Sequence, residues 1–402
     1  MKPPSHNPAR PLRVAVANLC NTQWIAGCHY LKNLTRALHT LDQPVEVVLV
    51  HWFPPVDDSH LTLKPLVDEE LFFTGVERSL PVRAASYLER RFNLPLGLDV
   101  PMAAFLRQHR IDALLHMNDM GAKFTFPLLV WVADFQHVHL PEMFTPEEIA
   151  QRNASIQTVA ERAQRVILSS RNARDDFARF TPQYADKARV LSFVSQLPPN
   201  AYDNDPAQVC AKYHLPERFF YLPNQFWKHK NHQVVVEALA HLRQRFPQIV
   251  VVCTGNPHDY RNPSHFPTLL AEISRSGIRE NFIILGMVPH DDIFPLMRQS
   301  LAVVQPSRFE GWSTTVEETK SLGKRMILSD IPVHREQNPP DALYFPVSDP
   351  RALADALVQV FDEAQPGPDA AMEAAAQDDL PHRTRTFAQT FVEIAREVAV
   401  AR

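Results

Sequence analysis

The stretch LAVVQPSRFEGWSTTVEETKSLGKRMIL, from Leu301 to Leu328, contains the pattern that decides the fold. Its apolar run at 301–304 has the length of a buried strand, and residues 325–328 form a second such run. Between them, Val316 to Leu322 has the composition of a helix, and Gly323 ends it where helices commonly adopt a left-handed residue. The stretch therefore predicts a strand, a loop, a helix and another strand.

Two glutamates flank the start of this predicted helix. Glu310 lies in the loop, and Glu318 lies one turn after Thr314 and Thr315. A helix N-terminus offers unpaired N–H groups and a partial positive charge, which favour phosphate. Carboxylates repel phosphate, so here they are expected to accept hydrogen bonds from neutral hydroxyls, as a nucleotide sugar offers with its ribose and its hexose. Two solvated surface glutamates are the alternative, because this spacing is common in strand–helix–strand units.

The segment FEGWSTTVEETKSLGK resembles the E-x7-E segment of retaining GT-B glycosyltransferases of glycosyltransferase family 4, usually EGFG-small-x-x-E-A-x-x-x-G. Ser313 departs from it where the family has glycine, and its Cβ restricts how closely the backbone approaches a sugar. The resemblance implies two Rossmann-like parallel-sheet domains facing a cleft, with a C-terminal helix that crosses back to the first domain. The matching positions are Glu310, Gly311, Glu318 and Gly323; Trp312 and Thr319 are further departures.

Composition narrows the class of protein. A chain of 402 residues suffices for two domains, and 45% hydrophobic with 21% charged residues is typical of a soluble globular protein. The net charge of −4, without a basic cluster, argues against nucleic acid as a partner. No apolar run reaches the roughly 20 residues of a membrane helix. Neither G-x-G-x-x-G nor G-x-x-x-x-G-K occurs, so dinucleotide oxidoreductases and P-loop enzymes are disfavoured.

The termini and cysteines predict a cytoplasmic protein. The polar, proline-rich N-terminus does not have the pattern of a signal peptide. The four cysteines lack metal-ligand or disulfide-framework spacing and are expected to be reduced and mostly buried. They are Cys20, Cys28, Cys210 and Cys253.

Strand and helix patterns alternate on both sides of the polar, proline-rich segment 196–206, the predicted linker. The domains are expected at 1–196 (acceptor side), 207–380 (nucleotide-sugar side) and 381–402 (crossover helix). Residues 203–205 read D-N-D, which could indicate a metal-dependent GT-A transferase, but they lie among linker residues and not at a strand end.

Strands are expected at 12–19, 45–50, 111–115, 128–132, 166–168, 190–194, 219–222, 249–253, 282–285, 301–304, 326–328 and 343–345. Helices are expected at 30–41, 103–109, from 145 and 172, and at 234–242, 291–298, 316–322, 349–358 and 383–400.

The loop Asn224 to His232 (NQFWKHKNH) is expected to contact a diphosphate. Lys228 and Lys230 can neutralise a leaving diphosphate, whereas two exposed cations at a helix start would oppose the helix dipole. Lys230 resembles the lysine of the family's R-x4-K element. Gln225 stands where the family has arginine, and Lys228 is the candidate replacement.

Other loops after predicted strands supply further candidates, each with an ordinary turn or surface residue as the alternative. Gly27 resembles one glycine of the family's Gly-Gly turn near the donor phosphate, with Cys28 in the second place. Asp134, His137 and His139 follow a predicted strand, and His137 is chosen as the family's histidine behind the hexose. Gly255 and Val288 occupy turns where the family holds base and ribose; His290 with Asp291 and Asp292 is expected to cap a helix, not to bind a metal.

By resemblance, the chain is expected to transfer a hexose or derivative from a UDP or GDP sugar to an acceptor hydroxyl, with retention and without metal or other cofactor. Glu318 would bind ribose and Glu310 the hexose. The leaving phosphate itself can take the acceptor proton, since no base–nucleophile pair is evident. The diphosphate charge would be stabilised by Lys228, Lys230 and the amides of Ser313, Thr314 and Thr315.

Two rival functions are an epimerase on the same fold and a non-catalytic nucleotide-sugar-binding subunit. Relatives in bacteria often build surface polysaccharides or glycolipids, so a glycan or a lipid-linked glycan is the expected acceptor. The basic stretch 83–91 (RAASYLERR) could rest on the inner face of the membrane, or be an ordinary exposed helix.

Overall fold

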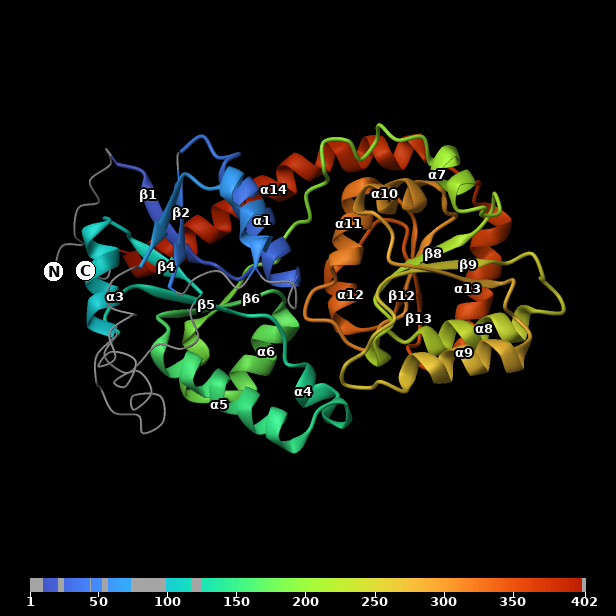
Figure 1. Cartoon of the computed structure of the whole chain (residues 1–402), viewed down its shortest axis with the longest axis horizontal. Helices are drawn as coiled ribbons and strands as arrows, with labels where there is room; N and C mark the ends of the chain where they lie inside the picture. The colour runs from blue at the N-terminus through green and yellow to red at the C-terminus, as the bar shows by residue number, and fades with distance from the viewer. Residues whose placement is uncertain are drawn as a thin grey trace. The chain divides into compact units, whose positions relative to one another are not determined.

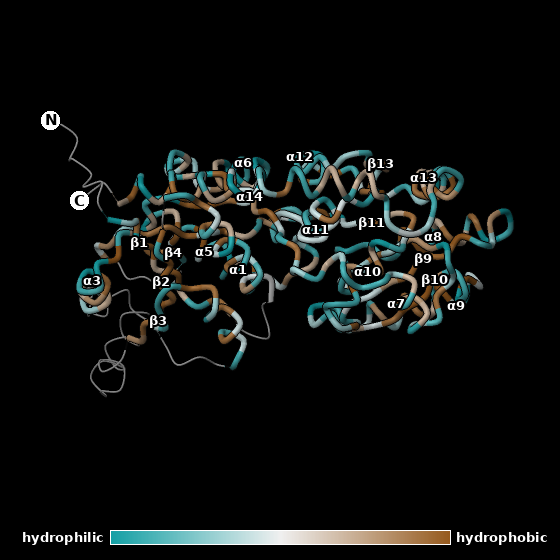
Figure 2. Tube along the Cα trace, turned by 90° about the horizontal axis from the view of Figure 1, so that it is seen from above, coloured by the Kyte–Doolittle hydropathy of each residue, from teal (hydrophilic) through white to brown (hydrophobic). Residues whose placement is uncertain are grey.

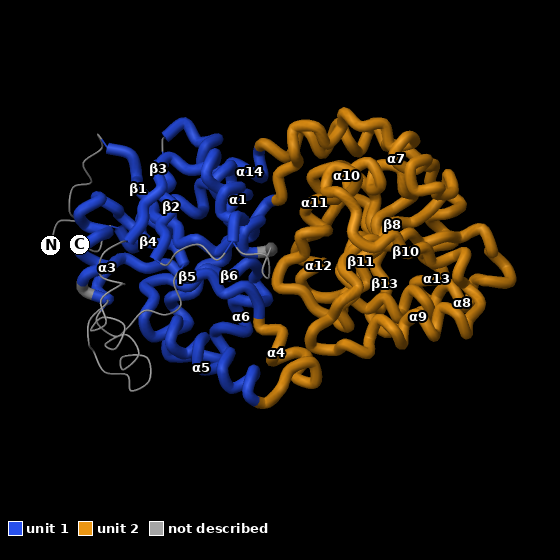
Figure 3. Tube along the Cα trace, viewed as in Figure 1, with its two compact units in different colours: residues 1–134, 147–194, 382–402 blue, residues 135–146, 195–381 orange. Residues whose placement is uncertain are grey.

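The computed structural model describes residues 10–20, 25–43, 45–52, 57–73, 99–116 and 124–399. The basic stretch 83–91 lies outside them. The chain forms two compact units, coloured separately in Figure 3. Unit 1 comprises Met1–Asp134, Glu147–Val194 and His382–Arg402; unit 2 comprises Phe135–Pro146 and Ser195–Pro381. Both units alternate strands with helices, so the predicted α/β class is confirmed (Figure 1).

Unit 1 contains a seven-stranded sheet in the order β3-β2-β1-β4-β5-β6-β7, and the described pairings are parallel. Its strands are β1 Leu12–Ala17, β2 Val45–His51, β3 Glu69–Phe72, β4 Ala113–Leu115, β5 Leu128–Val132, β6 Arg165–Leu168 and β7 Ala188–Val190. Its helices are α1 Ile25–Leu38, α3 Asp99–Gln108, α5 Pro146–Arg162 and α6 Arg171–Phe180, with short 3-10 turns η1 Asp58–Thr62, η2 Lys64–Leu66 and η4 Pro182–Lys187.

Unit 2 contains a six-stranded parallel sheet in the order β10-β9-β8-β11-β12-β13. Its strands are β8 Phe220–Pro223, β9 Val251–Thr254, β10 Phe282–Gly286, β11 Val303–Gln305, β12 Met326–Ser329 and β13 Leu343–Phe345. Its helices are α4 Gln136–His139, α7 Pro206–Lys212, α8 His232–Leu242, α9 His265–Ser276, α10 His290–Gln299, α11 Thr314–Leu322, α12 Pro332–Gln337 and α13 Pro350–Glu363, with η3 Pro141–Met143 and η5 Lys228–Lys230.

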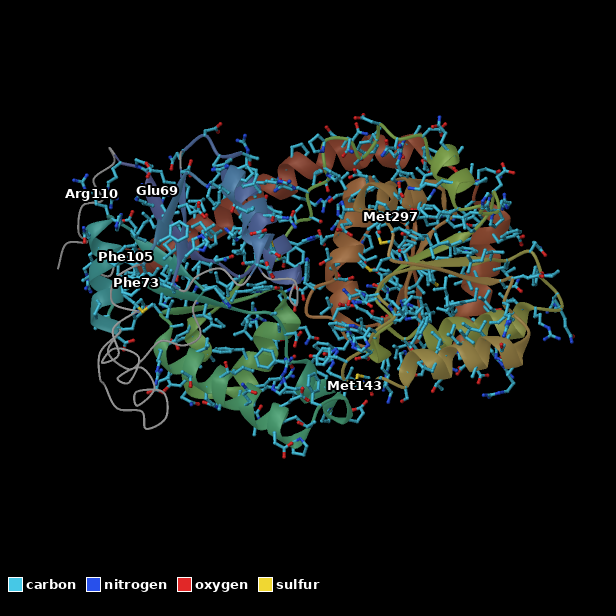
Figure 4. The ribbon with its side chains drawn as sticks, viewed as in Figure 1. Glu69, Phe73, Phe105, Arg110, Met143 and Met297 are labelled. Atoms are coloured by element: carbon cyan, nitrogen blue, oxygen red, sulfur yellow. A yellow bond between two sulfur atoms is a disulfide. The ribbon has the colours of Figure 1, made fainter. Side chains whose placement is uncertain are left out.

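The central strands are buried along almost their whole length, as expected where helices cover both faces of a parallel sheet. Strands β9 and β11 are buried at every residue, and β1 at all but one. Figure 2 shows hydrophobic residues along the strands and hydrophilic ones on the outer turns. In unit 1, aromatic rings add to this core: Phe73 and Phe105, labelled in Figure 4, meet edge to face at 5.3 Å, beside Trp52.

The last helix, α14 Ala370–Ala399, is shared between the units. Unit 2 ends at Pro381 and unit 1 resumes at His382, so this helix passes from one unit to the other. The predicted C-terminal crossover is therefore present. It begins well before residue 383, because Pro381 lies inside the helix instead of starting it.

Among the described helices and strands, five were not placed by the sequence: β3, α4, α7, α9 and α12. Strand β3 reads Glu-Glu-Leu-Phe and buries one residue only, as an edge strand does, so it lacks an apolar run. The predicted cap at His290–Asp292 is wrong, because α10 begins at His290 after Pro289 and has no side-chain cap. Asp292 instead pairs with Lys212 at 2.6 Å.

The cysteine expectation is wrong for one pair. Cys20 and Cys28 form a disulfide, because α1 starts so early that its first turn brings the two Cα atoms to 4.5 Å. Cys210 and Cys253 are buried free thiols, as expected. Disulfides are rare in reducing compartments, so cysteine usage does not support the expected cytoplasmic location.

Gly323 ends α11 as predicted, and its replacement should be costly. Its φ is +83°, and an added Cβ would lie 2.4 Å from the carbonyl oxygen of Met372. We expect Gly323→Ala to lower the free energy of unfolding by about 2–4 kcal/mol, since backbone strain and a backbone clash add. Gly286→Ala is the matched control: its φ is +71° but the space around it is open, so about 1 kcal/mol is expected. Equal losses in urea unfolding would contradict this account.

Candidate functional site

The sheet of unit 2 reverses its strand order between β8 and β11, and ligands of such sheets bind beyond the carboxyl ends of strands at this point. Asn224 directly follows β8, and Gln305 is the last residue of β11. The Asn224 side chain donates to Gln305 Oε1, and Gln305 Nε2 donates to Ser313 Oγ at 2.8 Å. These buried amides therefore hold the start of α11 against the ends of both strands.

Helix α11 begins at this network, and two backbone amides of its first turn donate no hydrogen bond to a described residue. Ser313 is its N-cap: its Oγ accepts from the amide of Val316 at 3.4 Å, and its own amide donates to Gln337 Oε1 at 3.3 Å. The amides of Thr314 and Thr315 have no partner among the described residues. They are the donors that an anion at this helix start would meet.

Glu310 and Lys230 form an ion pair beside this helix start. Lys230 Nζ lies 2.7 Å from Glu310 Oε1, and the two side chains are 18% and 10% exposed. Gln305 Nε2 approaches the same carboxylate oxygen at 3.4 Å. The pair joins the loop after β8 to the loop after β11, so a ligand that reaches one group also meets the other.

Glu318 is the second glutamate and lies in the middle of α11. The residue is half-buried, and desolvation by the surrounding protein raises its pKa to about 7. Its carboxylate accepts no hydrogen bond from any described residue. A carboxyl group that is partly protonated at neutral pH and lacks donors is suited to a ligand that brings hydroxyl groups.

His334 is a buried neutral histidine close to the same charges. Its Nδ1 lies 2.9 Å from the carbonyl oxygen of Ser329 and therefore donates to it, which leaves Nε2 as an acceptor. Burial lowers its pKa to about 4, with Glu310 and Lys230 as further influences on the ring. Nε2 and the hydroxyl of Ser307 are buried without a hydrogen-bond partner among the described residues.

Three predicted residues lie at neighbouring strand ends. Lys228 is exposed, and its backbone amide donates to Asp259 Oδ2 at 3.0 Å. Gly255 has a φ of +143°, and a Cβ there would lie 2.2 Å from the carbonyl oxygen of Asn224, so the close backbone approach requires glycine. Val288 packs against the core of unit 2 and is half-buried.

Segment 135–146 belongs to unit 2 and contacts the loop that carries Glu310. His139 stacks on Phe309, with ring centroids 5.0 Å apart, and Glu142 Oε1 lies 3.6 Å from Arg308 Nη2. His137 is buried, with its ring edge-on to Phe144 at 6.3 Å. His139 thus contacts the Glu310 loop through Phe309, and the role of His137 behind the hexose stays a prediction.

Gly27 lies in unit 1, inside the first turn of α1 and buried. The helix predicted from residue 30 already starts at Ile25, so Gly27 lies in a helix and not in the turn that the resemblance implies. The disulfide joins Cys28, the next residue in this turn, to Cys20.

Sequence reasoning missed several polar groups at this site. Asn224 and Gln305 could have been found, because a polar residue at the carboxyl end of a buried parallel strand marks the ligand edge. His334, Gln337 and Arg261 gave no such signal, since their contacts depend on tertiary packing.

Two negative observations complete the description. Across residues 10–399 as far as they are described, no group of three or more His, Cys, Asp or Glu residues has the arrangement of a metal site. None of the helices in that part of the chain is long and apolar enough to cross a bilayer.

Residues 212–378 match the family described as glycosyl transferases group 1. The matched region lies within unit 2 and contains every site residue named above except those of segment 135–146 and Gly27. Curated proteins yielded no match. The family match and the fold together support a glycosyltransferase.

Solved structures of GT-B proteins resemble the whole chain. The Anabaena protein Alr3699/HepE in complex with UDP is 16% identical, with a TM-score of 0.67 over 96% of this chain and 100% of that one. A glycosyltransferase from Rickettsia africae is 15% identical, with a TM-score of 0.65 over 97% and 99%. Sucrose-phosphate synthase from Thermosynechococcus elongatus is 16% identical, with a TM-score of 0.60 over 96% and 97%. At these identities the likeness establishes the GT-B fold.

Proposed function

We propose that the chain is a retaining glycosyltransferase of the family 4 type, which moves a hexose from a nucleotide-diphosphate sugar to a hydroxyl of a glycan or lipid-linked acceptor. The observation that carries this proposal is the ion pair of Lys230 and Glu310 beside the start of α11, a helix that bears Glu318 and two amides without a partner among the described residues. In this proposal Lys230 and the amides bind the diphosphate. Glu318 accepts hydrogen bonds from the ribose hydroxyls, and Glu310 accepts them from the hexose hydroxyls.

The ion pair suggests how donor binding prepares the site. Without ligand, Lys230 and Glu310 neutralise each other at 2.7 Å. A diphosphate competes for the lysine, because two charged oxygens attract it more strongly than one carboxylate does. Glu310 is then released to accept hydrogen bonds from the hexose. In this proposal the free amides of Thr314 and Thr315, with Lys230, stabilise the charge that develops on the leaving diphosphate.

No protein base is required for the transfer. As the bond from the anomeric carbon to the diphosphate oxygen breaks, the acceptor oxygen bonds to that carbon on the same face. The acceptor proton passes to the departing phosphate oxygen, so charge and atoms balance. Lysines and helix amides fill the electrostatic role that a metal has in other transferases, and we propose that none is needed.

Uracil is the nucleotide base to test first. The Anabaena structure holds UDP, and related structures of the same protein hold UDP with glucose and UDP-glucose. Thermal-shift measurements with UDP, GDP and their hexose conjugates should show the largest stabilisation for one nucleotide and its sugars. If no nucleotide raises Tm at millimolar concentration, the proposal fails.

The two glutamates are expected to have separable roles. Glu318→Gln should weaken donor binding about 10- to 100-fold at pH 8, the scale of a hydrogen bond to a charged group, with a smaller effect on turnover. Glu310→Gln should lower turnover as well, because its contacts lie at the reacting hexose. Isothermal titration and initial rates separate the two effects. Wild-type kinetics in both variants would rule out these roles.

The rival functions are distinguished by products. An epimerase would convert the donor with no acceptor present, whereas a binding subunit would neither transfer nor slowly hydrolyse it. Nuclear magnetic resonance of the donor after incubation, with and without a mixture of sugar acceptors, separates the three cases. An axial or equatorial anomeric proton unchanged from donor to product would establish retention.

A further inference from the structure

Arg261 is a buried arginine enclosed by aromatic rings at the edge of the site. Its side chain is 5% exposed, and its guanidinium carbon lies 5.0 Å from the ring centroids of both Trp227 and Phe144 and 5.7 Å from that of Tyr260. Cation–π contacts of this kind are stronger when water is excluded from them. The guanidinium group is thus held between the rings of Trp227 and Phe144, with the exposed Tyr260 beside them.

The three rings come from three separate segments of unit 2. Trp227 directly precedes Lys228 on the loop after β8, Tyr260 lies on the loop after β9, and Phe144 lies in segment 135–146. Arg261 therefore sits where these segments meet.

Asp259 fixes the lysine loop to the same arginine. Its Oδ2 accepts from the amide of Lys228 at 3.0 Å, and its Oδ1 accepts from the amide of Arg261 at 3.1 Å. The carboxylate is buried, with its side chain 1% exposed. A displacement of Arg261 is thus transmitted to the turn Lys228–Lys230 through one rigid acceptor.

Gln136 connects the arginine to the histidine segment. Arg261 Nη1 donates to Gln136 Oε1 at 2.9 Å, and Gln136 is buried directly before His137. The same segment reaches the Glu310 loop through His139 and Phe309. Met143, labelled in Figure 4, is buried within it.

We propose that Arg261 is a positioning residue for glycosyl transfer, which holds segment 135–146 in register with the Lys228–Lys230 turn; this inference rests on the proposed function. The guanidinium does not itself bind phosphate, because rings and Gln136 enclose it. Its contacts set the distance between Lys230, which neutralises the diphosphate, and segment 135–146, which contacts the loop that carries Glu310. Glu318, on helix α11, is outside this set of contacts.

The test compares nucleotide binding with turnover. In Arg261→Met, the release of UDP from UDP-glucose should fall about 100-fold, the effect of a misplacement near 1 Å, while the Kd for UDP changes less than about threefold. Arg261→Lys, which keeps the positive charge but lacks the planar guanidinium group, should recover part of the rate. Gln136→Leu, which keeps the aromatic cage, should show the same split between rate and affinity.

Arg243→Met is the matched control, because Arg243 also lies in unit 2 and donates to a carbonyl, that of Ser276, on exposed helices. It should leave rate and affinity unchanged. If Arg261→Met and Gln136→Leu keep the wild-type rate, or lose UDP binding and rate in equal proportion, the inference is overturned. If Arg261→Met does not fold, Gln136→Leu alone decides. If wild type and Arg243→Met bind neither UDP nor GDP and release neither from its hexose conjugate, the proposed function fails first.

Discussion

Replacing Lys230 with methionine is expected to lower turnover by about 100- to 1,000-fold, because in the proposed function this half-buried lysine neutralises the leaving diphosphate. Methionine keeps the length and apolar stem of the side chain but removes the ammonium group. The loss should be in turnover more than in the Kd for UDP, since the charge on the diphosphate grows as the bond to the sugar breaks.

The same substitution should also destabilise the protein. Glu310 would remain as a carboxylate with only 10% of its side chain exposed and without its partner, which costs about 3 kcal/mol for a buried pair. The double variant Lys230→Met with Glu310→Gln should regain most of this stability and none of the activity. Urea unfolding gives the stability and initial rates give the activity. Both are measured on wild type, Lys230→Met, Glu310→Gln and the double variant.

Lys228→Met is the matched control for charge. Lys228 is exposed and has no described side-chain partner, so its loss should reduce the rate about tenfold or less, the value of a screened contact. A larger loss for Lys228→Met than for Lys230→Met would reverse the assignment and make Lys228 the main diphosphate ligand. A stable single variant Lys230→Met would show that the ion pair is weak.

The sequence predicted the elements whose signals are local. The apolar run before Glu310 and the glycine at 323 place β11 and α11 correctly, because a buried parallel strand and a left-handed helix end have distinctive residues. The edge strand β3 was missed because one buried leucine makes no periodic pattern. The start of α1 was placed too late, and the disulfide between Cys20 and Cys28 was missed with it.

The contacts that connect the site were not predictable in the same way. Lys230 and Glu310 are 80 residues apart, and Arg261 and Gln136 are 125 apart, so neither pair leaves a pattern in a local window. Both glutamates could be singled out by spacing and resemblance, but their different surroundings could not. One has a cation within 2.7 Å and the other has no hydrogen-bond donor among the described residues.

Its partial burial gives Glu318 a pH dependence. Burial raises the pKa of Glu318 from 4.5 to about 7. Hydroxyls that donate to the carboxylate favour its ionised form, so binding a donor should release a proton near neutral pH. The phosphates of UDP-glucose do not titrate in this range, which makes it a better probe than UDP.

Affinity should therefore rise with pH. If only the ionised carboxylate binds, the Kd for UDP-glucose should be about tenfold weaker at pH 6 than at pH 8, because one pH unit below the pKa leaves about a tenth of the sites ionised. Titration calorimetry at pH 7 in buffers of different ionisation enthalpy should detect the released proton. Glu318→Gln should abolish both the pH dependence and the proton release.

The free energy of unfolding should fall as pH rises, whereas donor affinity increases. The folded state holds a proton on Glu318 that the unfolded chain has already lost, so the free energy of unfolding falls as pH rises from about 4.5 to 7 and stays low above that. A shift from 4.5 to about 7 corresponds to about 3 kcal/mol. Glu318→Gln has no such charge to bury, so it should match wild type near pH 4.5 and exceed it at pH 8. A variant that unfolds earlier than wild type at pH 8 would show that the carboxylate is stabilised by the fold, and that it is not held there for a ligand.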